Sequence, residues 1–525
     1  MGSSVSVVCG SRSAAAPPTC VALPCASMEP SRRSRRSTRA PHGPDVPHVP
    51  HVPHVPHVPR ARRAPRRTCN PWSPAALALA ALGALGALAA PAALNAQSPS
   101  SAEAQPPANV GEAFARAQQA LSARDYRALQ RALRAALAFA PDDAAALYHL
   151  ARAEALTGDG AAAVATLERL APQGAARDVA ADSAFAALRA LPHFQAVARR
   201  LAASAAPVVR SDTAFVLADP DFIPEGIAHD PGDDAFYVGS LHRRNILRVA
   251  RDGAVSEFAK PGQDNLGQVL GLRVDGAARR LWVATLVIDS AAPRFARGTG
   301  GWAALHAYDL RTGRLVRRYA APDSSRPHLL NDIALAPGGD LYVTDSEGNA
   351  LYRLRAGADR LEPVHAGTRD FTYPNGVAVA ADGTRLYVAH WEGMSTLAFA
   401  GAAAGRVTRV AAPPGLPTGN VDGLYACPGG LIAVQRLLDF QQVTWFDLGP
   451  GGAAIAGARA LERRHPAHDA ATTGAVARGA LYYIANAQLG RLRDDGQLAP
   501  AREPRGTVVL RLPLDGACGA GPPRR

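Results

Sequence analysis

The chain has 525 residues, too long for one typical domain, and carries a formal net charge of +13 at pH 7. Residues 1–75 hold eleven Arg against two acidic residues, Glu29 and Asp45, so most of that charge lies in this segment. The rest of the chain is close to neutral. This balance argues against a protein that binds nucleic acid or an anionic membrane surface.

Residues 1–74 are predicted to be a disordered, low-complexity leader. They contain the tract PHVPHVPHVPHVP, which favours polyproline II, with Arg-rich segments on both sides. Met28 offers an alternative start of translation, so the true start codon stays open.

Residues 75–96 are predicted to be a secretory signal. The basic segment RARRAPRR precedes an Ala- and Leu-rich run that ends at Leu94, and Ala96 offers a small residue for cleavage. A membrane-spanning helix is the alternative, because the run is about 20 residues long. Its Ala and Gly content favours cleavage, which predicts an exported protein, periplasmic or extracellular, with no stable membrane span after processing. Residues 97–108 read as a linker.

Residues 109–205 have a helical period and are predicted to form a small helical domain. The segment 141–172 pairs two helices around a tight Gly-Asp-Gly turn, with Pro141 and Asp142 opening the first helix. This pair resembles a tetratricopeptide repeat with degenerate pairs on either side. The resemblance implies a peptide partner for this domain, and simple packing is the alternative role. We expect a chain that starts near Val208 to fold without it.

Residues 211–516 have a period of two with turns every 8–12 residues, which predicts hairpins. One pattern repeats about every 44–60 residues, a spacing typical of propeller blades. The fold class is therefore predicted to be mainly β, a six-bladed propeller preceded by a small α-helical domain. The early strand TAFVLAD should pair with TVVLRLPL and close the ring. The six innermost strands are expected to start near Glu225, Gly271, Asn331, Asn375, Asp422 and Thr473.

Four of these starts carry an oxygen-bearing side chain in a short motif: PEG, LLND, YPNG and VDG. Each motif alone is weak, because Asn and Asp are common in turns. Together, on four blades in one register, they predict an axial site built from Glu225, Asn331, Asn375 and Asp422. Such hard oxygen ligands suit a divalent metal, with Ca²⁺ first and Mg²⁺, Mn²⁺ or Zn²⁺ as alternatives.

These motifs resemble those of the gluconolactonase, senescence-marker-protein and luciferin-regenerating-enzyme family of six-bladed propellers. The resemblance implies that Glu225, Asn375 and Asp422 hold the metal, and that Asn331 lies beside the metal or the substrate. Asp422 and Asn331 are then the candidate catalytic residues. Sugar lactonases of the family carry Arg where this chain has Leu329. The difference favours a more apolar lactone, an ester or a phosphotriester.

Four further residues are candidates for the substrate pocket: Leu329, Asp332, His328 and His390. A histidine beside the site is a candidate general base, although a loop or surface role is the default for each. The leading function is a metal-dependent hydrolase acting on a small lactone or ester. The alternative is a non-catalytic exported scaffold in which the propeller and the helical repeats bind protein or ligand. A strictosidine-synthase-like propeller without metal is a third reading.

Only Cys427 and Cys518 lie outside the predicted leader and signal segment. The sequence leaves open whether they form a disulfide or remain two buried thiols. No paired Cys and His cluster indicates a structural zinc site.

Overall fold

The computed structural model describes residues 105–518, apart from gaps at 175–177, 205, 288–301, 324–326, 368–370, 402–403, 439, 494–496 and 502. The predicted leader, the signal segment and residues 97–104 of the linker lie outside the described residues. Within the described part, no helix is long and apolar enough to cross a membrane.

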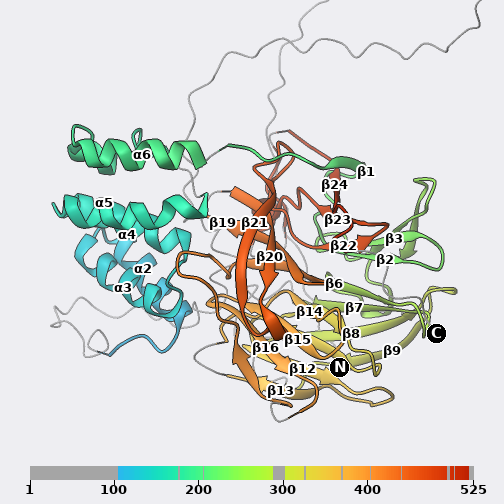
Figure 1. Cartoon of the computed structure of the whole chain (residues 1–525). Coiled ribbons are helices and arrows are strands. Elements are labelled where there is room, and N and C mark those ends of the chain that lie inside the picture. Colours follow the sequence, from blue (N-terminus) through green and yellow to red (C-terminus); the bar gives the residue numbers. More distant parts are fainter. Residues whose placement is uncertain are drawn as a thin grey trace, which may run out of the picture. The chain divides into compact units, whose positions relative to one another are not determined.

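Six four-stranded antiparallel sheets form the blades of a β-propeller (Figure 1). The predicted fold class, a mainly β six-bladed propeller after a small helical region, is confirmed. Blades 1 to 3 contain β2 (Pro224–Asp230), β3 (Ala235–Ser240), β4 (Ile246–Val249), β5 (Val255–Ala259); β6 (Gln268–Asp275), β7 (Arg280–Val287), β8 (Trp302–Asp309), β9 (Leu315–Ala320); and β10 (Leu330–Leu335), β11 (Leu341–Asp345), β12 (Ala350–Leu354), β13 (Glu362–Ala366). Blades 4 to 6 contain β14 (Val377–Val379), β15 (Arg385–His390), β16 (Gly393–Ala398), β17 (Val407–Arg409); β18 (Val421–Cys427), β19 (Gly430–Leu437), β20 (Phe440–Leu448), β21 (Ile455–Arg463); and β22 (Gly474–Ala477), β23 (Ala480–Ile484), β24 (Thr507–Pro513), β1 (Asp212–Leu217).

The first strand of the propeller closes the ring. β1 pairs antiparallel with β24, with Leu217 opposite Thr507 and Thr213 opposite Leu510, as the sequence predicts. Closure in this way gives the sixth blade its fourth strand and covers the outer edge of β24. A disulfide joins Cys427, at the end of β18, to Cys518 after β24, with their Cα atoms 5.0 Å apart. The structure thus decides for the disulfide over two free thiols.

Burial changes from the inner to the outer strands of a blade. Every residue of β3 is buried, whereas the first three residues of β5 are exposed. Inner strands are covered on both faces by neighbouring blades, so they form continuous apolar runs instead of a polar and apolar alternation. The core therefore lies between the blades, around the axis.

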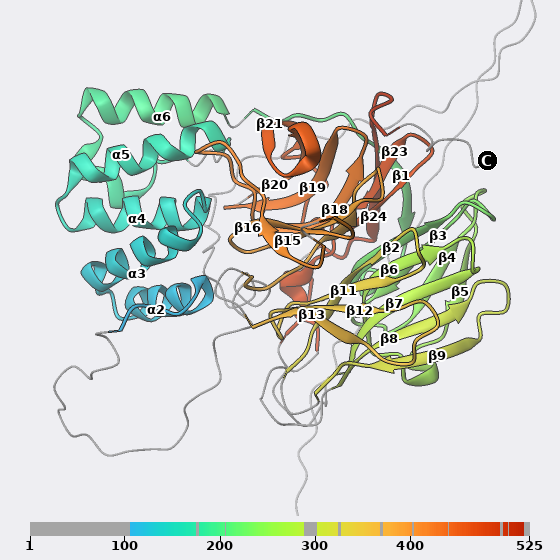
Figure 2. The same ribbon diagram turned by 60° about the horizontal axis from the view of Figure 1, so that its bottom comes forward.

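The helical region stacks its helices in chain order (Figure 2). Side chains of Asn109, Asp125, Asp143 and Asp159 cap the first four helices by accepting a backbone N–H. The cap of the third is Asp143, one residue later than the predicted opening. The helices are α2 (Val110–Ser122), α3 (Tyr126–Phe139), α4 (Ala144–Leu156), α5 (Gly160–Leu170), η2 (Ala171–Gln173), η3 (Ser183–Leu188) and α6 (Pro192–Ser204), with short turns η4 (Gln263–Asn265), η5 (Pro450–Gly452) and η6 (Leu489–Arg491) in the propeller.

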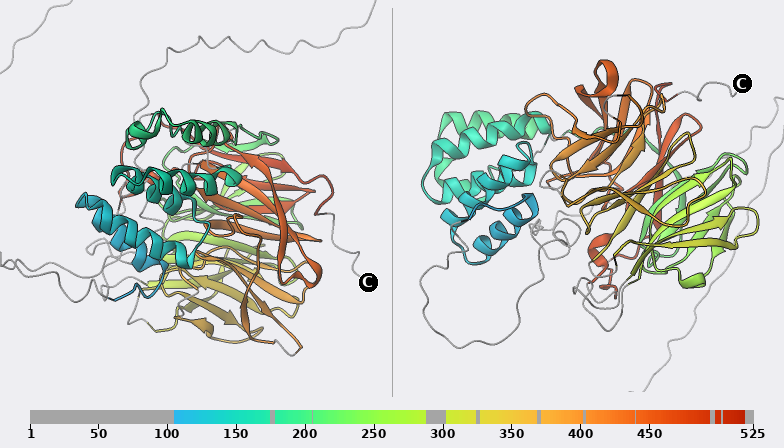
Figure 3. Two further views of the ribbon diagram at one scale, coloured as in Figure 1. Left: turned by 60° about the vertical axis from the view of Figure 1, so that its left-hand side comes forward. Right: turned by 90° about the horizontal axis from the view of Figure 1, so that it is seen from below.

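One apolar core is shared by the helical region and the propeller, which the sequence did not predict. The two ribbon views of Figure 3 show the helices beside the strands of the propeller. Leu437 and Phe440, on either side of the β19–β20 turn, are 1% and 4% exposed within the core of the helices. Phe114 of α2 stacks on Trp391 of blade 4, with ring centroids 4.9 Å apart. The expectation that the two regions fold separately stays a prediction, and this shared core argues against it, because separation would expose these side chains.

Candidate functional site

The four axial residues occupy equivalent places in four blades. Glu225, Asn331 and Asp422 lie within or at the start of β2, β10 and β18, at a point where the pairing with the next strand shifts register. Such a bulge re-aims the side chain away from the regular pleat. Asn375 stands two residues before β14, and its backbone N–H donates to Ala389 O at 2.9 Å.

Close contacts between the innermost strands of neighbouring blades fix the positions of the axial residues around the propeller axis. A Cβ on any of several glycines that follow the axial positions would collide with the next blade, so only glycine permits the approach. The sixth blade returns to the first through Thr473, whose hydroxyl donates to Glu225 O at 2.6 Å. The glycine contacts are Gly226 with Leu270 O, Gly271 with Asn331 O, and Gly376 with Asp422 O.

Hydrogen bonds fix how the two amides are turned. Asn331 Nδ2 donates to Ser346 Oγ, and Asn375 Nδ2 donates to Asp422 Oδ1, each at 3.0 Å. The carbonyl Oδ1 of both amides and Oε2 of Glu225 are then buried without a hydrogen-bond partner among the described residues. Leaving a buried acceptor unpaired costs about 1–3 kcal/mol. Three such oxygens at one level point to a site that accepts a cation or a donor.

The site concentrates negative charge. Burial raises the pKa of Glu225 well above its ordinary value, and the charges of Asp422 and Asp332 raise it further. Burial raises the pKa of Asp422 to about 6, against the lowering effects of the Asn375 hydrogen bond and of Arg436. These carboxyls therefore lie close enough to repel one another, and a cation would relieve that repulsion.

Arg436 on β19 is a charged neighbour that sequence reasoning missed. Its guanidinium acts electrostatically on Asp422 and on Asp469. The available signal is weak: a positive charge near the end of the mainly apolar strand Gly430–Leu437. Thr472 was missed as well, and Thr473 was predicted only as a strand start, although both hydroxyls donate to Glu225 O.

The structure holds the two predicted pocket histidines inside their own blades. His328 Nδ1 lies 2.5 Å from Asp345 Oδ2. The ring nitrogens of His390 lie 2.8 Å from Glu392 Oε2 and 2.9 Å from Ser395 Oγ. Both rings are buried. These contacts leave Asp422 as the stronger candidate for a general base.

Asp332 links two blades. Its Oδ2 accepts from Val377 N at 3.1 Å and its Oδ1 accepts from Ile333 N at 2.8 Å. Asp332 stands where neighbouring blades carry glycine, so it joins blade 3 to blade 4 through its side chain. Burial raises the pKa of this carboxyl, while Arg273 lowers it. Its charge adds to the negative potential at the axial site. Both of its oxygens accept backbone hydrogen bonds, so neither is free to contact a substrate.

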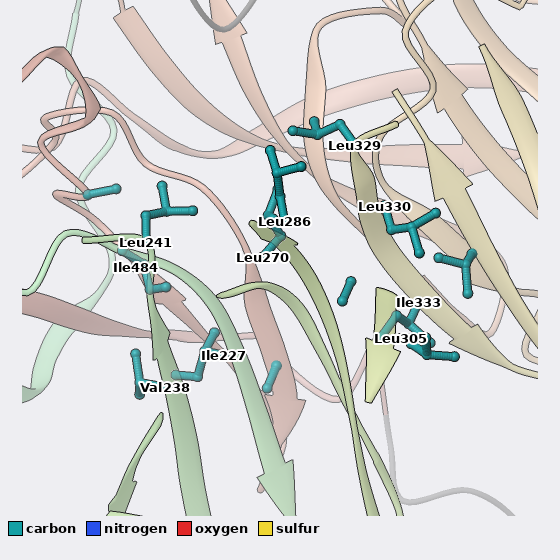
Figure 4. Packing of buried hydrophobic residues seen from close by; sticks show 14 of the residues in the cluster. Ile227, Val238, Leu241, Leu270, Leu286, Leu305, Leu329, Leu330, Ile333 and Ile484 are labelled. Atoms are coloured by element: carbon teal, nitrogen blue, oxygen red, sulfur yellow. The ribbon is translucent and has the colours of Figure 1, made fainter. Parts of the chain in front are cut away.

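An apolar wall borders the site on blades 1 to 3. Leu329, the predicted pocket residue, is 7% exposed and belongs to the same buried cluster as Leu241, Leu270 and Leu286. In Figure 4, Leu270, Leu286 and Leu329 lie near the ends of strands, and Ile227 and Ile333 lie farther along them. In the second blade, Leu270 takes the place that the other motifs give to an oxygen ligand. Apolar side chains therefore lie beside the axial positions of these three blades.

The residues present fit a divalent cation. The described part of the chain has no group of three or more His, Cys, Asp or Glu side chains arranged to hold a metal, so the two amide oxygens are essential to the set. Two carboxylates and two amide carbonyls are all hard oxygen donors, as Ca²⁺ prefers. Two negative charges would also balance the charge of the ion.

Calcium stabilisation should depend on pH. Without a cation, the pKa values of Glu225 and Asp422 are higher in the folded chain than in the unfolded chain. The folded chain therefore holds more protons between about pH 4 and pH 6, and the free energy of unfolding falls as pH rises through this window. A cation competes with these protons. We expect Ca²⁺ at about 100 times its Kd to add about 2.7 kcal/mol near pH 7.5 and almost nothing near pH 5. Melting curves with Ca²⁺ or chelator at both pH values test this, and an equal shift at both would place the ion elsewhere.

No protein-family model matches the chain, and no curated protein matches it. Solved structures similar to it include a gluconolactonase from Xanthomonas campestris, with 19% identity, 58% of this chain and 94% of that chain covered, and a TM-score of 0.40. The calcium-binding protein regucalcin from Agrobacterium tumefaciens has 16% identity, coverage of 57% and 95%, and a TM-score of 0.37. A PQQ-bound aldose sugar dehydrogenase from Streptomyces coelicolor has 16% identity, coverage of 58% and 99%, and a TM-score of 0.37. The names differ in chemistry, so the likeness does not select an activity.

Proposed function

We propose that the chain is a metal-dependent hydrolase of the lactonase or esterase type, acting at the axial site on an apolar small-molecule substrate. The observation that carries the proposal is the set of three unpaired, buried oxygens on Glu225, Asn331 and Asn375 beside the carboxylate of Asp422. The apolar wall favours an acyl or lactone chain over a sugar, because sugar hydroxyls buried there would lose their hydrogen bonds to water.

Each axial residue has a distinct task in this proposal. Glu225, Asn331, Asn375 and Asp422 would hold the cation. A bound divalent cation supplies Lewis-acid chemistry that polarises the carbonyl oxygen of an ester or lactone. Burial raises the pKa of Asp422 to about 6 in the absence of a cation, so its carboxylate is ionised near neutral pH and would accept a proton from the attacking water. Leu270 and Leu329 would hold the apolar part of the substrate and exclude water.

A substrate panel tests the proposal. Full-length protein is stripped with chelator, reloaded separately with Ca²⁺, Mg²⁺, Mn²⁺ or Zn²⁺, and assayed with aliphatic lactones, aryl esters, a phosphotriester and a sugar lactone. We expect turnover that is lost on chelation, returns with Ca²⁺, and favours the aliphatic substrates over the sugar lactone.

Two results would contradict it. Undiminished turnover after exhaustive chelation would remove the metal from the reaction. Calcium binding with no turnover of any substrate would favour the non-catalytic scaffold, in which the ion only stabilises the propeller. Preference for the sugar lactone would leave the metal intact and overturn the role of the apolar wall.

A further inference from the structure

The helical region contacts the propeller on the face where the axial residues lie. In each blade the innermost strand starts at the same face at which the second strand ends, because the two are antiparallel. Trp391 directly follows β15, and Leu437 is the last residue of β19; these are the second strands of blades 4 and 5. Both residues pack against the helices. The helices therefore lie over blades 4 and 5 on the side of Asn375 and Asp422.

One hydrogen bond crosses from the helices to the segment that leads into Asp422. Asp143 Oδ1 caps α4 by accepting from Ala146 N at 2.8 Å, and its Oδ2 accepts from Asn420 Nδ2 at 2.9 Å. The carboxylate is 7% exposed. Asn420 has a left-handed φ of 54° and stands two residues before Asp422. One side chain thus ties a helix terminus to the backbone of a proposed ligand.

The propeller holds the same segment from the other side. Gln435 Nε2 donates to Gly419 O at 3.0 Å and to Pro417 O at 3.2 Å. Arg436 N donates to Asn420 O at 3.0 Å. Because Arg436 also acts on Asp422, displacement of Asn420 would move both charged groups of the site together.

Packing alone does not fix this segment on the helical side. A cavity of about 230 Å³ lies between the helical region and blades 4 and 5, and its lining includes Asp143, Trp391 and residues 416–420. Atoms that line a cavity lack packing contacts on the side that faces it. The bond between Asp143 and Asn420 crosses the edge of this space, so it restrains the segment from the side of the helices.

We propose that Asp143 is a positioning residue for the axial site: its bond to Asn420 holds the segment that orients Asp422, and the helical region thereby sets the cation affinity of the propeller. The proposal rests on the proposed function for the identity of the axial ligand. Removing a residue that orients a metal ligand, without itself binding the metal, typically weakens metal binding by about 10–100-fold.

The test uses full-length protein and the substitution Asp143→Ser. Serine is as good an N-cap as aspartate, so α4 keeps its cap while the reach to Asn420 is lost. Asp125→Ser and Asp159→Ser are matched controls, because both residues cap helices of the same stack, through Ala128 N and Ala162 N, on exposed sites. Asn420→Gly removes the same bond from the propeller side, and glycine keeps the left-handed φ.

Two readouts are measured: Ca²⁺ affinity by calorimetry, and hydrogen exchange of the peptide that spans residues 416–424. We expect Asp143→Ser and Asn420→Gly each to weaken Ca²⁺ binding by about 10–100-fold and to speed exchange in this peptide, with no added effect in the double variant. Both controls should match the unsubstituted protein.

The outcomes separate the two proposals. If the unsubstituted protein binds no Ca²⁺, the proposed function fails, while faster exchange in Asp143→Ser alone would still support the restraint. If Ca²⁺ binds and neither Asp143→Ser nor Asn420→Gly changes affinity or exchange, the positioning role is wrong. An equal loss in the Asp125→Ser control would assign the effect to general loosening of the helices. Should Asp143→Ser fail to fold, Asn420→Gly decides, because it leaves every helix intact.

Discussion

Replacing Asp422 with alanine should remove both bound calcium and hydrolysis. The substitution deletes one of the two negative ligands and the candidate base, and it leaves Asn375 Nδ2 without its 3.0 Å partner. Loss of an outer partner of a metal ligand already costs about 10–100-fold, so we expect loss of this ligand to lower kcat/KM by more than about 100-fold. Metal analysis by mass spectrometry, beside turnover of the best substrate, measures both effects.

Asp382 offers a matched control for this variant. It is also followed by glycine, but it lies in the exposed turn between β14 and β15, where its Oδ1 accepts from Thr384 N at 3.0 Å. Asp382→Ala should keep full activity and metal content. An Asp422→Ala protein as active as the Asp382→Ala protein would end the metallohydrolase interpretation.

A chain that starts at Val208 should be largely insoluble, in contrast to what its sequence alone predicts. Removing the helices uncovers Leu437 and Phe440, which are 1% and 4% exposed, and the face of Trp391 that stacks on Phe114. Each such side chain contributes about 1.5–3 kcal/mol when buried. Soluble yield and a melting curve measure the outcome.

The control is a second shortened chain, one that keeps the core shared by the helices and the propeller. A chain that starts at Gln105 removes only residues outside the described part and should stay soluble with its full melting temperature. Replacing Leu437 and Phe440 with serine in the shorter chain should recover part of the solubility. A fully soluble and cooperative chain from Val208 would show that the shared core is dispensable.

The sequence predicted the blades well because their cause is local. Alternation, turns and the spacing of Glu225, Asn331, Asn375 and Asp422 arise within single hairpins, so they are readable in one pass. The pairing of β1 with β24 could be predicted as well, because the sixth four-stranded blade lacked one strand that the early segment could supply. The signal segment, the export and the peptide partner stay predictions.

What the sequence did not reveal depends on contacts between distant segments. The bond from Asn420 to Asp143 joins residues 277 positions apart, and no motif marks either one. The direction of each asparagine amide is set by Ser346 and Asp422, which lie on other strands or other blades. The bulges that re-aim the axial side chains are register effects, which depend on the partner strand and not on composition.

The way the ring closes has a consequence for how the protein is made. Thr213 pairs with Leu510, so the sixth blade is assembled from the first and the last strands of the propeller. Contacts so far apart in sequence give a high contact order, which slows folding. A ribosome that adds about 5–20 residues per second leaves β1 unpaired for many seconds before β24 emerges. During that interval β1 is an exposed strand edge, and a chaperone that shields it would decide how much of the chain reaches the closed ring.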